Sequence, residues 1–444
     1  MNRNIFLPIL ILFAFLACSA PKKTGAEKPK TDKKATTKKK ESAKTGARSK
    51  SVMYNPASTR IHPAYTVFHN SDNSSVLMVK VFPSELLFSA ANPEGKLLAK
   101  LRISYYLTEI TDHTAPMPAD SGSYEYTILK ENAEKRFLAQ LPLKTEKGRI
   151  YDLQISTSDM LRNDMHRDYV IVDKRSPFSQ QNYRITETVN NLPFFEPFVT
   201  GSNPFRFEYR TDTFHRVYVS YYGQESPLPR PSFSLVRERE FMEKPDSLWI
   251  LDYQKNTTYL LAYEGIYHFQ FDTATREGLT VYNFGPDFPR IKRPLQMIEP
   301  LAYLTSSVEY EEIKNSVNQK LAIDNFWLGL TNNSMDRARE LIRVYYNRVY
   351  FANYYFTTFK PGWKTDRGMI YIIYGPPQSV TRAAGKEKWI YYTNNFTTTL
   401  TFTFDFSPSS YTTDNFILER SEGYDGFWRQ AVETWHKGTV FMFE

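Results

Sequence analysis

The sequence predicts a multidomain, mainly β protein in which two tandem β-sandwiches precede an α+β domain. Three observations carry this prediction. Aromatic residues make up 16% of the 444 residues, which is enough ring surface to build several cores. Runs of β-branched and aromatic residues, separated by turn-forming residues, recur up to about residue 294. Beyond Pro294, apolar residues at helical spacing appear beside further strand-like runs.

Residues 1–18 predict a lipoprotein signal peptide. Arg3 precedes an apolar run from Ile5 to Ala17. This run is shorter than the roughly 20 residues that span a bilayer, and it is typical of a signal-peptide core. Its end, Phe-Leu-Ala-Cys, resembles a bacterial lipobox, in which the cysteine after a small residue receives the lipid. Because Cys18 is the only cysteine, we expect it to be lipidated and to begin the mature chain; a chance cysteine after a secretory signal is the alternative.

Residues 19–52 predict a disordered, Lys-rich tether. Residues 19–50 hold twelve Lys and Arg against three acidic residues, without any aromatic residue, Val, Ile or Leu. Such a segment cannot bury enough apolar surface to offset its ordering entropy. It is either a plain spacer or a contact for anionic lipid or cell-wall carboxylates through Lys38, Lys39 and Lys40. The net charge of +8 therefore belongs to this end of the chain, and no nucleic-acid partner is expected.

Two segments of similar length predict the sandwiches, residues 53–175 and residues 183–294. Strand-like runs in the first are Val76–Phe82, Leu101–Leu107 and Tyr169–Val172, and those in the second are Phe205–Tyr209, Val217–Tyr221 and Leu248–Leu251. Strands spaced this way in segments of roughly 110 residues are typical of immunoglobulin-like sandwiches.

An internal echo supports the tandem arrangement. The hexamer Ile150–Ile155 is similar to Ile266–Phe271, and each alternates apolar and polar residues shortly after a glycine. One short match is a weak sign of duplication, but its offset is close to the length of one sandwich.

Residues 295–444 predict the α+β domain. Ser306 and Glu309 form a capping-box pair, and Ile313, Val317 and Leu321 continue from it at helical spacing. A second helix is predicted after Asn333, with Asp336 in its first turn. Its apolar face consists of Met335, Ala338, Leu341, Tyr345, Val349 and Ala352.

Three strands and a last helix complete the predicted domain. The strands are Met369–Tyr374, Lys388–Tyr392 and Leu400–Phe406, the last with strict alternation typical of a sheet buried on one face. The helix covers about Gly426–His436, with Gly438 at its C-terminal cap.

One signature inside this domain resembles that of the GWxTD-domain family, envelope lipoproteins of the Bacteroidota. Residues 362–366 read Gly-Trp-Lys-Thr-Asp, and the resemblance covers about 295–444. The residues that match are Gly362, Trp363, Thr365, Asp366, Arg367, Gly368, Tyr374, Gly375, Pro376 and Pro377. The resemblance implies an address in the envelope and no established activity.

The signature has a structural and a functional interpretation. In the first, Gly362 permits a close approach that a β-carbon would block, Trp363 anchors the core, and Asp366 caps a helix or pairs with Arg367. The turn after Tyr374 then takes the chain out of a strand. In the second, Trp363, Asp366 and Arg367 line a binding groove.

Residues that suggest catalysis or metal binding are sparse. Asp164, His166 and Asp168 have metal-like spacing, but we place them in a solvated polar turn before the strand Tyr169–Val172. The carboxylates Asp405, Asp414 and Glu419 have the chemistry for acid–base work on a glycan, yet no pattern brings two of them together. We expect no catalytic residues, metal or cofactor.

The expected function is that of a non-catalytic lipoprotein on the periplasmic face of the outer membrane. Surface-exported lipoproteins of the resembled group carry an acidic run after the cysteine, whereas the residues after Cys18 are basic. We expect a membrane contact through the lipid and an envelope protein as partner, in assembly or secretion. The alternative is a glycan-binding lipoprotein with aromatic-rich sandwiches. The tripeptides at 246–248 and 272–274 also resemble periplasmic O-glycosylation sites.

Overall fold

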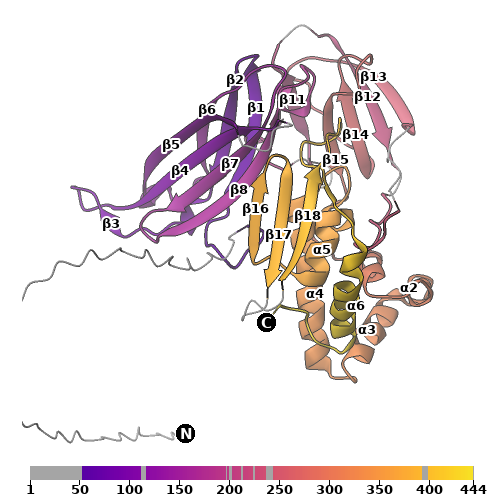
Figure 1. Cartoon of the computed structure of the whole chain (residues 1–444). Coiled ribbons are helices and arrows are strands. Elements are labelled where there is room, and N and C mark those ends of the chain that lie inside the picture. Colours follow the sequence, from indigo (N-terminus) through magenta and orange to yellow (C-terminus); the bar gives the residue numbers. More distant parts are fainter. Residues whose placement is uncertain are drawn as a thin grey trace, which may run out of the picture. The chain divides into compact units, whose positions relative to one another are not determined.

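The computed structural model describes most of the chain beyond residue 52. The described residues are 53–111, 117–196, 198–199, 203–211, 214–223, 226–236, 244–392 and 399–443. The predicted signal peptide with Cys18 and the predicted tether 19–52 lie outside them. The fold is mainly β, with helices gathered in the C-terminal third (Figure 1).

The first β region consists of two antiparallel sheets that share one core. The three-stranded sheet contains β1 (Ala64–Ser71), β2 (Ser74–Val81) and β6 (Phe137–Lys144). The five-stranded sheet contains β3 (Ala90–Ala91), β4 (Leu97–Glu109), β5 (Met117–Leu129), β7 (Ile150–Asp159) and β8 (Asp164–Asp173). Leu77 and Val79 of one sheet pack with Leu101 and Leu153 of the other, so the region is sandwich-like.

The second β region pairs a small sheet with a large one. The small sheet contains β9 (Tyr183–Glu187) and β11 (Phe205–Tyr209). The large sheet has the order β10 (Phe198–Val199), β15 (Leu279–Asn283), β14 (Gly265–Gln270), β12 (Arg216–Tyr222) and β13 (Ser247–Asp252). The core between them is largely aromatic, with Phe205, Phe207 and Phe269 fully buried. Many of the aromatic residues of the sequence thus form this core.

The two echoed hexamers occupy corresponding places in the two large sheets. Ile150–Ile155 lies in β7, which pairs antiparallel with the next strand, β8. Ile266–Phe271 begins in β14, which pairs antiparallel with β15. The whole first hexamer and the residues Ile266–Gln270 of the second thus lie in strands.

The C-terminal region packs helices against an antiparallel sheet. The helices are α1 (Pro294–Ile298), α2 (Ser307–Lys314), α3 (Gln319–Leu330), α4 (Met335–Phe356), α5 (Asp366–Tyr374) and α6 (Asp425–His436). The sheet has the order β16 (Ser379–Ala383), β17 (Lys386–Tyr392), β18 (Thr399–Phe406) and β19 (Phe416–Leu418). No helix of the described segments has the length and hydropathy that a membrane crossing needs.

Two predicted elements of this region are wrong. Met369–Tyr374 is not a strand but the body of α5, which Thr365 caps by accepting a hydrogen bond from the amide of Gly368. All nine residues of α5 are buried, so the segment lacks the one-sided periodicity that marks a surface helix. The helix after Ser306 ends at Lys314, and Val317 is fully exposed in the break before α3.

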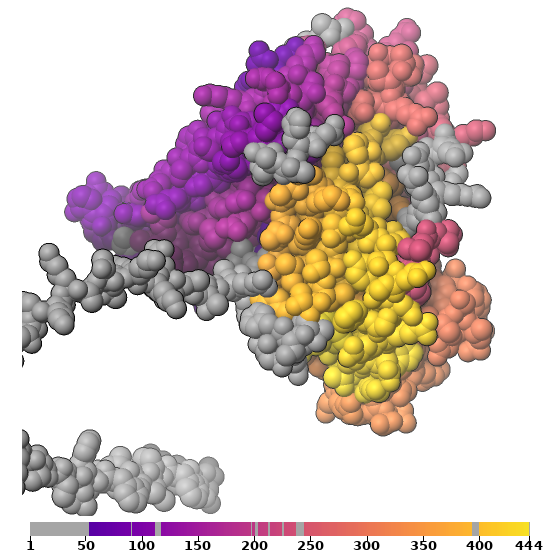
Figure 2. All heavy atoms as spheres, in the orientation of Figure 1, coloured from indigo at the N-terminus to yellow at the C-terminus, as the bar shows by residue number. Residues whose placement is uncertain are grey.

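The three regions contact one another through polar side chains. Tyr282 of β15 donates a 2.6 Å hydrogen bond to the carbonyl of Tyr411, and Gln180 bonds the carbonyl of Thr280. Asp152 of β7 forms an ion pair with Arg382 of β16 at 3.2 Å. Figure 2 shows the resulting contact between the surface of the first region and that of the C-terminal region.

Candidate functional site

The signature segment lies against the longest helix. Residues Gly362–Lys364 form one 3-10 turn beside α4, and a β-carbon on Gly362 would overlap the carbonyl oxygen of Ala352. A β-carbon on Gly368 would overlap the carbonyl oxygen of Gly362 in the same way. The two glycines therefore allow backbone-to-backbone contact among α4, this turn and α5.

Trp363 is buried in the core of the C-terminal region, with 5% of its surface exposed. Its amide donates to the side-chain oxygen of Asn353, and its carbonyl accepts a 2.7 Å bond from the Tyr303 hydroxyl. Trp363 also lines a cavity of about 370 Å³, and the ammonium group of Lys364 lies over its ring. Neither Asp366 nor Arg367 lines that cavity, so the three side chains do not share it.

Asp366 has partners other than those predicted. It forms an ion pair with Arg420 at 2.7 Å and accepts a 2.8 Å hydrogen bond from the amide of Leu418 in β19. The predicted pair with Arg367 does not form, and the helix cap is Thr365. Since Arg420 lies 54 positions along the chain, only the tertiary fold brings the two charges together.

The end of the signature terminates α5. Gly375 has φ +84°, a conformation that L side chains rarely adopt. The Arg348 guanidinium donates hydrogen bonds to the last carbonyls of the helix, those of Ile372 and Ile373. Gly375 and the following Pro376 and Pro377 thus end a helix, where the sequence predicts the end of a strand.

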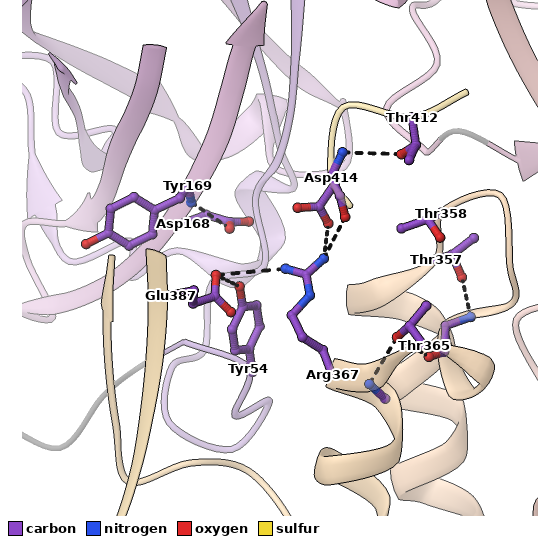
Figure 3. A network of polar contacts seen from close by, with 12 residues as sticks. Tyr54, Asp168, Tyr169, Thr357, Thr358, Thr365, Arg367, Glu387, Thr412 and Asp414 are labelled. Atoms are coloured by element: carbon purple, nitrogen blue, oxygen red, sulfur yellow. Dashed lines mark hydrogen bonds and ion pairs between the residues drawn. The ribbon is translucent and has the colours of Figure 1, made fainter. Parts of the chain in front are cut away.

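Arg367 is the centre of a buried ionic network, drawn in Figure 3. Its guanidinium, 2% exposed, lies 2.6 Å from a carboxylate oxygen of Asp414 and 3.8 Å from Glu387. The rings of Phe356 and Phe416 cover its faces. Burial by itself lowers the pKa of Arg367, but the charges of Asp414 and Glu387 outweigh it and raise the pKa.

Glu387 extends the network toward the first β region. Its carboxylate is fully buried in β17 and accepts hydrogen bonds from the hydroxyl of Tyr54 and the indole of Trp389. Arg382 lies 3.4 Å from Glu387 and 3.2 Å from Asp152 of β7. No sequence pattern predicted Tyr54, Asp152, Arg382 or Glu387 as site residues. A signal for Glu387 was present, because it alternates with the buried Trp389 and Tyr391.

A cavity of about 300 Å³ adjoins this network; we call it the junction cavity. Side chains from all three regions line it, among them Tyr65 of β1, Asp168 of β8, Tyr355 of α4 and Asp414. Figure 3 shows the carboxyl groups of Asp168 and Asp414 directed toward one another. Burial raises the pKa of Asp168 to about 7, although its bond from the Tyr169 amide acts in the opposite direction.

The predicted metal-like cluster takes a different form. Asp164, His166 and Asp168 lie inside strand β8 and not in a polar turn, because β8 begins at Asp164. Asp164 accepts a hydrogen bond from the amide of Arg60, and His166 bonds the Tyr65 hydroxyl. Within the described segments, no three such side chains are grouped as a metal site would require.

The other candidate carboxylates are dispersed. Asp405 forms a surface ion pair with Lys386, whereas Asp414 belongs to the buried network. Glu419 follows β19, and its amide bonds the carbonyl of Thr403. Of the two predicted glycosylation tripeptides, one spans the start of β13 and the other lies in the exposed turn after β14; their modification stays a prediction.

These features define a class of protein. It is mainly β, and its C-terminal α+β domain buries a tryptophan and an arginine beside its longest helix. Residues 265–437 match the family model of the GWxTD domain. This part of the chain is therefore a GWxTD domain. The match begins in β14, so the predicted boundary at residue 295 lies inside it. No curated protein matches the chain.

A pair of glycine substitutions tests the close approach of the signature segment. We expect Gly362→Ala to destabilise the protein by about 1–3 kcal/mol or more, because its β-carbon meets backbone that cannot rotate away. Gly329→Ala in α3 is the control: its β-carbon would enter open space, and alanine should stabilise the helix by about 0.5–1 kcal/mol. Urea unfolding measures both, and equal effects would contradict the packing argument.

Proposed function

We propose that the protein is a non-catalytic lipoprotein of the outer membrane, held at the periplasmic face by lipid on Cys18, and that it acts as a protein-interaction component of the envelope. The resemblance to Bacteroidota lipoproteins and the basic residues after Cys18 support this address. We also interpret its two β regions as immunoglobulin-like, since each pairs a small sheet with a five-stranded one.

The exposed edge strand β13 carries the proposal. It is the last strand of its sheet and pairs with β12 alone among the described strands (Figure 1). Its central residues are apolar yet exposed: Leu248 58%, Trp249 37%, Ile250 59% and Leu251 39%. Natural edge strands are normally short, charged or covered, because an open edge pairs with other chains.

Both faces of β13 contribute to this surface. Trp249 and Leu251 lie opposite the core residues Val219 and Val217 of β12, so they extend the core face beyond its covering sheet. Leu248 and Ile250 lie on the other face. Trp249 also stacks on the ring of Tyr267. An extended segment added to this edge would gain main-chain hydrogen bonds and two rows of apolar contacts.

The partner that fits is an extended, apolar segment of another envelope protein. Such a segment pairs through its backbone and places alternate side chains on the two faces. A polysaccharide lacks the regularly spaced main-chain N–H and C=O groups that complete a strand edge. This edge therefore favours a protein partner over the glycan alternative.

A crosslinker at position 250 tests this interaction. The experiment is done in intact cells with the Ile250→Cys variant. Because Cys18 is lipidated, the cysteine at position 250 is the single free thiol of this protein, and it carries the photoactivatable group. We expect an adduct with an envelope protein that Leu248→Lys abolishes, because a lysine on the edge opposes strand addition. The control carries the same group at Leu321 of α3, which is 53% exposed. Equal adducts from both positions, or polysaccharide alone, would refute the proposal.

The anchor has its own test. Cys18→Ser removes the thiol that receives the lipid, so we expect the protein to move from the membrane to the soluble fraction. Fractionation with labelled fatty acid measures this. The native protein should resist protease added to whole cells. Continued membrane association of Cys18→Ser would contradict the lipid anchor, and cleavage on whole cells would contradict the periplasmic face.

A further inference from the structure

The junction cavity lies where carboxyl groups outnumber basic groups. Four carboxyl groups lie in or beside it, those of Asp152, Asp168, Glu387 and Asp414. Arg367 and Arg382 are the guanidinium groups that pair with them, through four ion pairs of 2.6 to 3.8 Å. If all six groups are ionised, two negative charges are left over.

Asp168 is the carboxyl group that these ion pairs leave out. Its Oδ1 accepts a 2.7 Å hydrogen bond from the amide of Tyr169, and the described residues place no cation within ion-pair distance of it. Most of the surface of Asp168 is covered, and the residue lines the cavity. Enclosing a charge without a partner is costly, so this group needs a proton or a cation.

The other charged groups around the cavity are already occupied. Arg184 pairs with Glu208, Glu196 pairs with Lys80, and His62 at the rim pairs with Glu85. Burial lowers the pKa of His166 to about 4, so its ring is neutral at pH 7. None of these groups supplies the missing positive charge to Asp168.

Aromatic rings form much of the remaining cavity wall, including Tyr65, Phe68, Phe194, Tyr354 and Tyr355. The faces of such rings attract cations. Phe195 is one of the lining residues, and Lys80 already lies 4.7 Å from its ring, which shows this kind of contact next to the cavity. A volume of about 300 Å³ is at the lower end for ligand sites and suits one short chain or side chain.

We propose that the junction cavity binds a primary ammonium group on an aliphatic stem, with Asp168 as its counter-charge and the aromatic wall around its stem. Such a group is carried by a free alkylamine or by the lysine side chain of a partner protein. An anion would add to the excess negative charge, and a neutral polyol would leave it unpaired. The site is independent of the edge strand β13.

Calorimetry with n-butylammonium chloride, at constant ionic strength and pH 8, tests the site on the full chain carrying Cys18→Ser. We expect saturable binding of one cation per chain and no binding of n-butanol, which has the same stem without the charge. Asp168→Asn should weaken the affinity at least tenfold and keep the native melt. Asp336→Asn, at a side chain that is 95% exposed, should leave the affinity unchanged.

The pH dependence provides an independent readout. A bound cation favours the ionised carboxyl group, so binding displaces a proton from Asp168. With the pKa of Asp168 near 7, affinity should rise about tenfold from pH 6 to pH 8 and then level off. The contact with Glu85 raises the pKa of His62 at the rim, so His62→Gln is included. The rise should persist in His62→Gln and vanish in Asp168→Asn.

Three outcomes would overturn the proposal. They are equal binding of butanol, no saturable binding, and an affinity that is unchanged in Asp168→Asn. A short peptide with an internal lysine distinguishes the two sources of the amine. Binding of both probes indicates a partner's lysine, and binding of butylammonium alone indicates a free amine. A failure here leaves the crosslinking test at position 250 unaffected, since that test uses another surface.

Discussion

Trp363→Ala is expected to lower the free energy of unfolding by about 3–5 kcal/mol, the usual cost of emptying a large buried aromatic site. The indole lies in the core of the C-terminal region and packs edge-on against Tyr303. Its loss leaves a void enclosed by backbone that the signature glycines hold close, so the site cannot collapse easily. Urea unfolding of the full chain carrying Cys18→Ser measures the change.

Trp249→Ala is the matched control for this prediction. Trp249 is 37% exposed on the edge strand β13, so we expect its replacement to cost about 1 kcal/mol. A normal unfolding curve for Trp363→Ala together with a lost crosslinked partner would show that Trp363 serves binding and not packing. The two interpretations of the signature thus give opposite results in the same pair of measurements.

The second large effect is expected from Arg367→Leu, at about 3–5 kcal/mol. Removing one member of a buried ion pair leaves the other charge without compensation. Here Asp414 would lose its ion pair with Arg367, and Glu387 would keep Arg382 but lose Arg367. Combining Arg367→Leu with Asp414→Asn should recover part of the loss, because the uncompensated charge is then removed.

Arg343→Leu on α4 provides the comparison for the arginine. Arg343 pairs with Glu340 at 2.6 Å, but both side chains are more than half exposed. Exposed pairs contribute about 0.2–1 kcal/mol, since water screens the attraction. A similar loss in both arginine variants would contradict a buried network at Arg367.

Elements whose pattern is local could be predicted from the sequence alone. The strand Phe205–Tyr209 has the bounds that its alternation predicts, and the capping box at Ser306 forms as its two residues require. In α4, five of the six predicted face residues are buried, and only Met335 is exposed. Each of these signals depends on residues a few positions apart, so a folded context is not needed to read it.

Elements whose environment is made by remote segments could not be predicted in this way, because their conformation depends on the folded chain. The run Met369–Tyr374 is apolar on all sides, and such a run fits a buried strand or a buried helix equally well. Enclosure within the C-terminal core and the cap at Thr365 select the helix. The run Leu248–Leu251 is equally apolar, but it lies at a sheet edge and is exposed.

The candidate site depended on the tertiary structure almost entirely. The signature located Trp363, Asp366 and Arg367, yet their partners Tyr303, Arg420 and Asp414 lie about 50 to 60 positions away. The junction cavity needs walls from three regions that the sequence places far apart. Periodicity reports which face of an element is buried, whereas the pairing of charges depends on which remote face covers it, and only the folded chain fixes that.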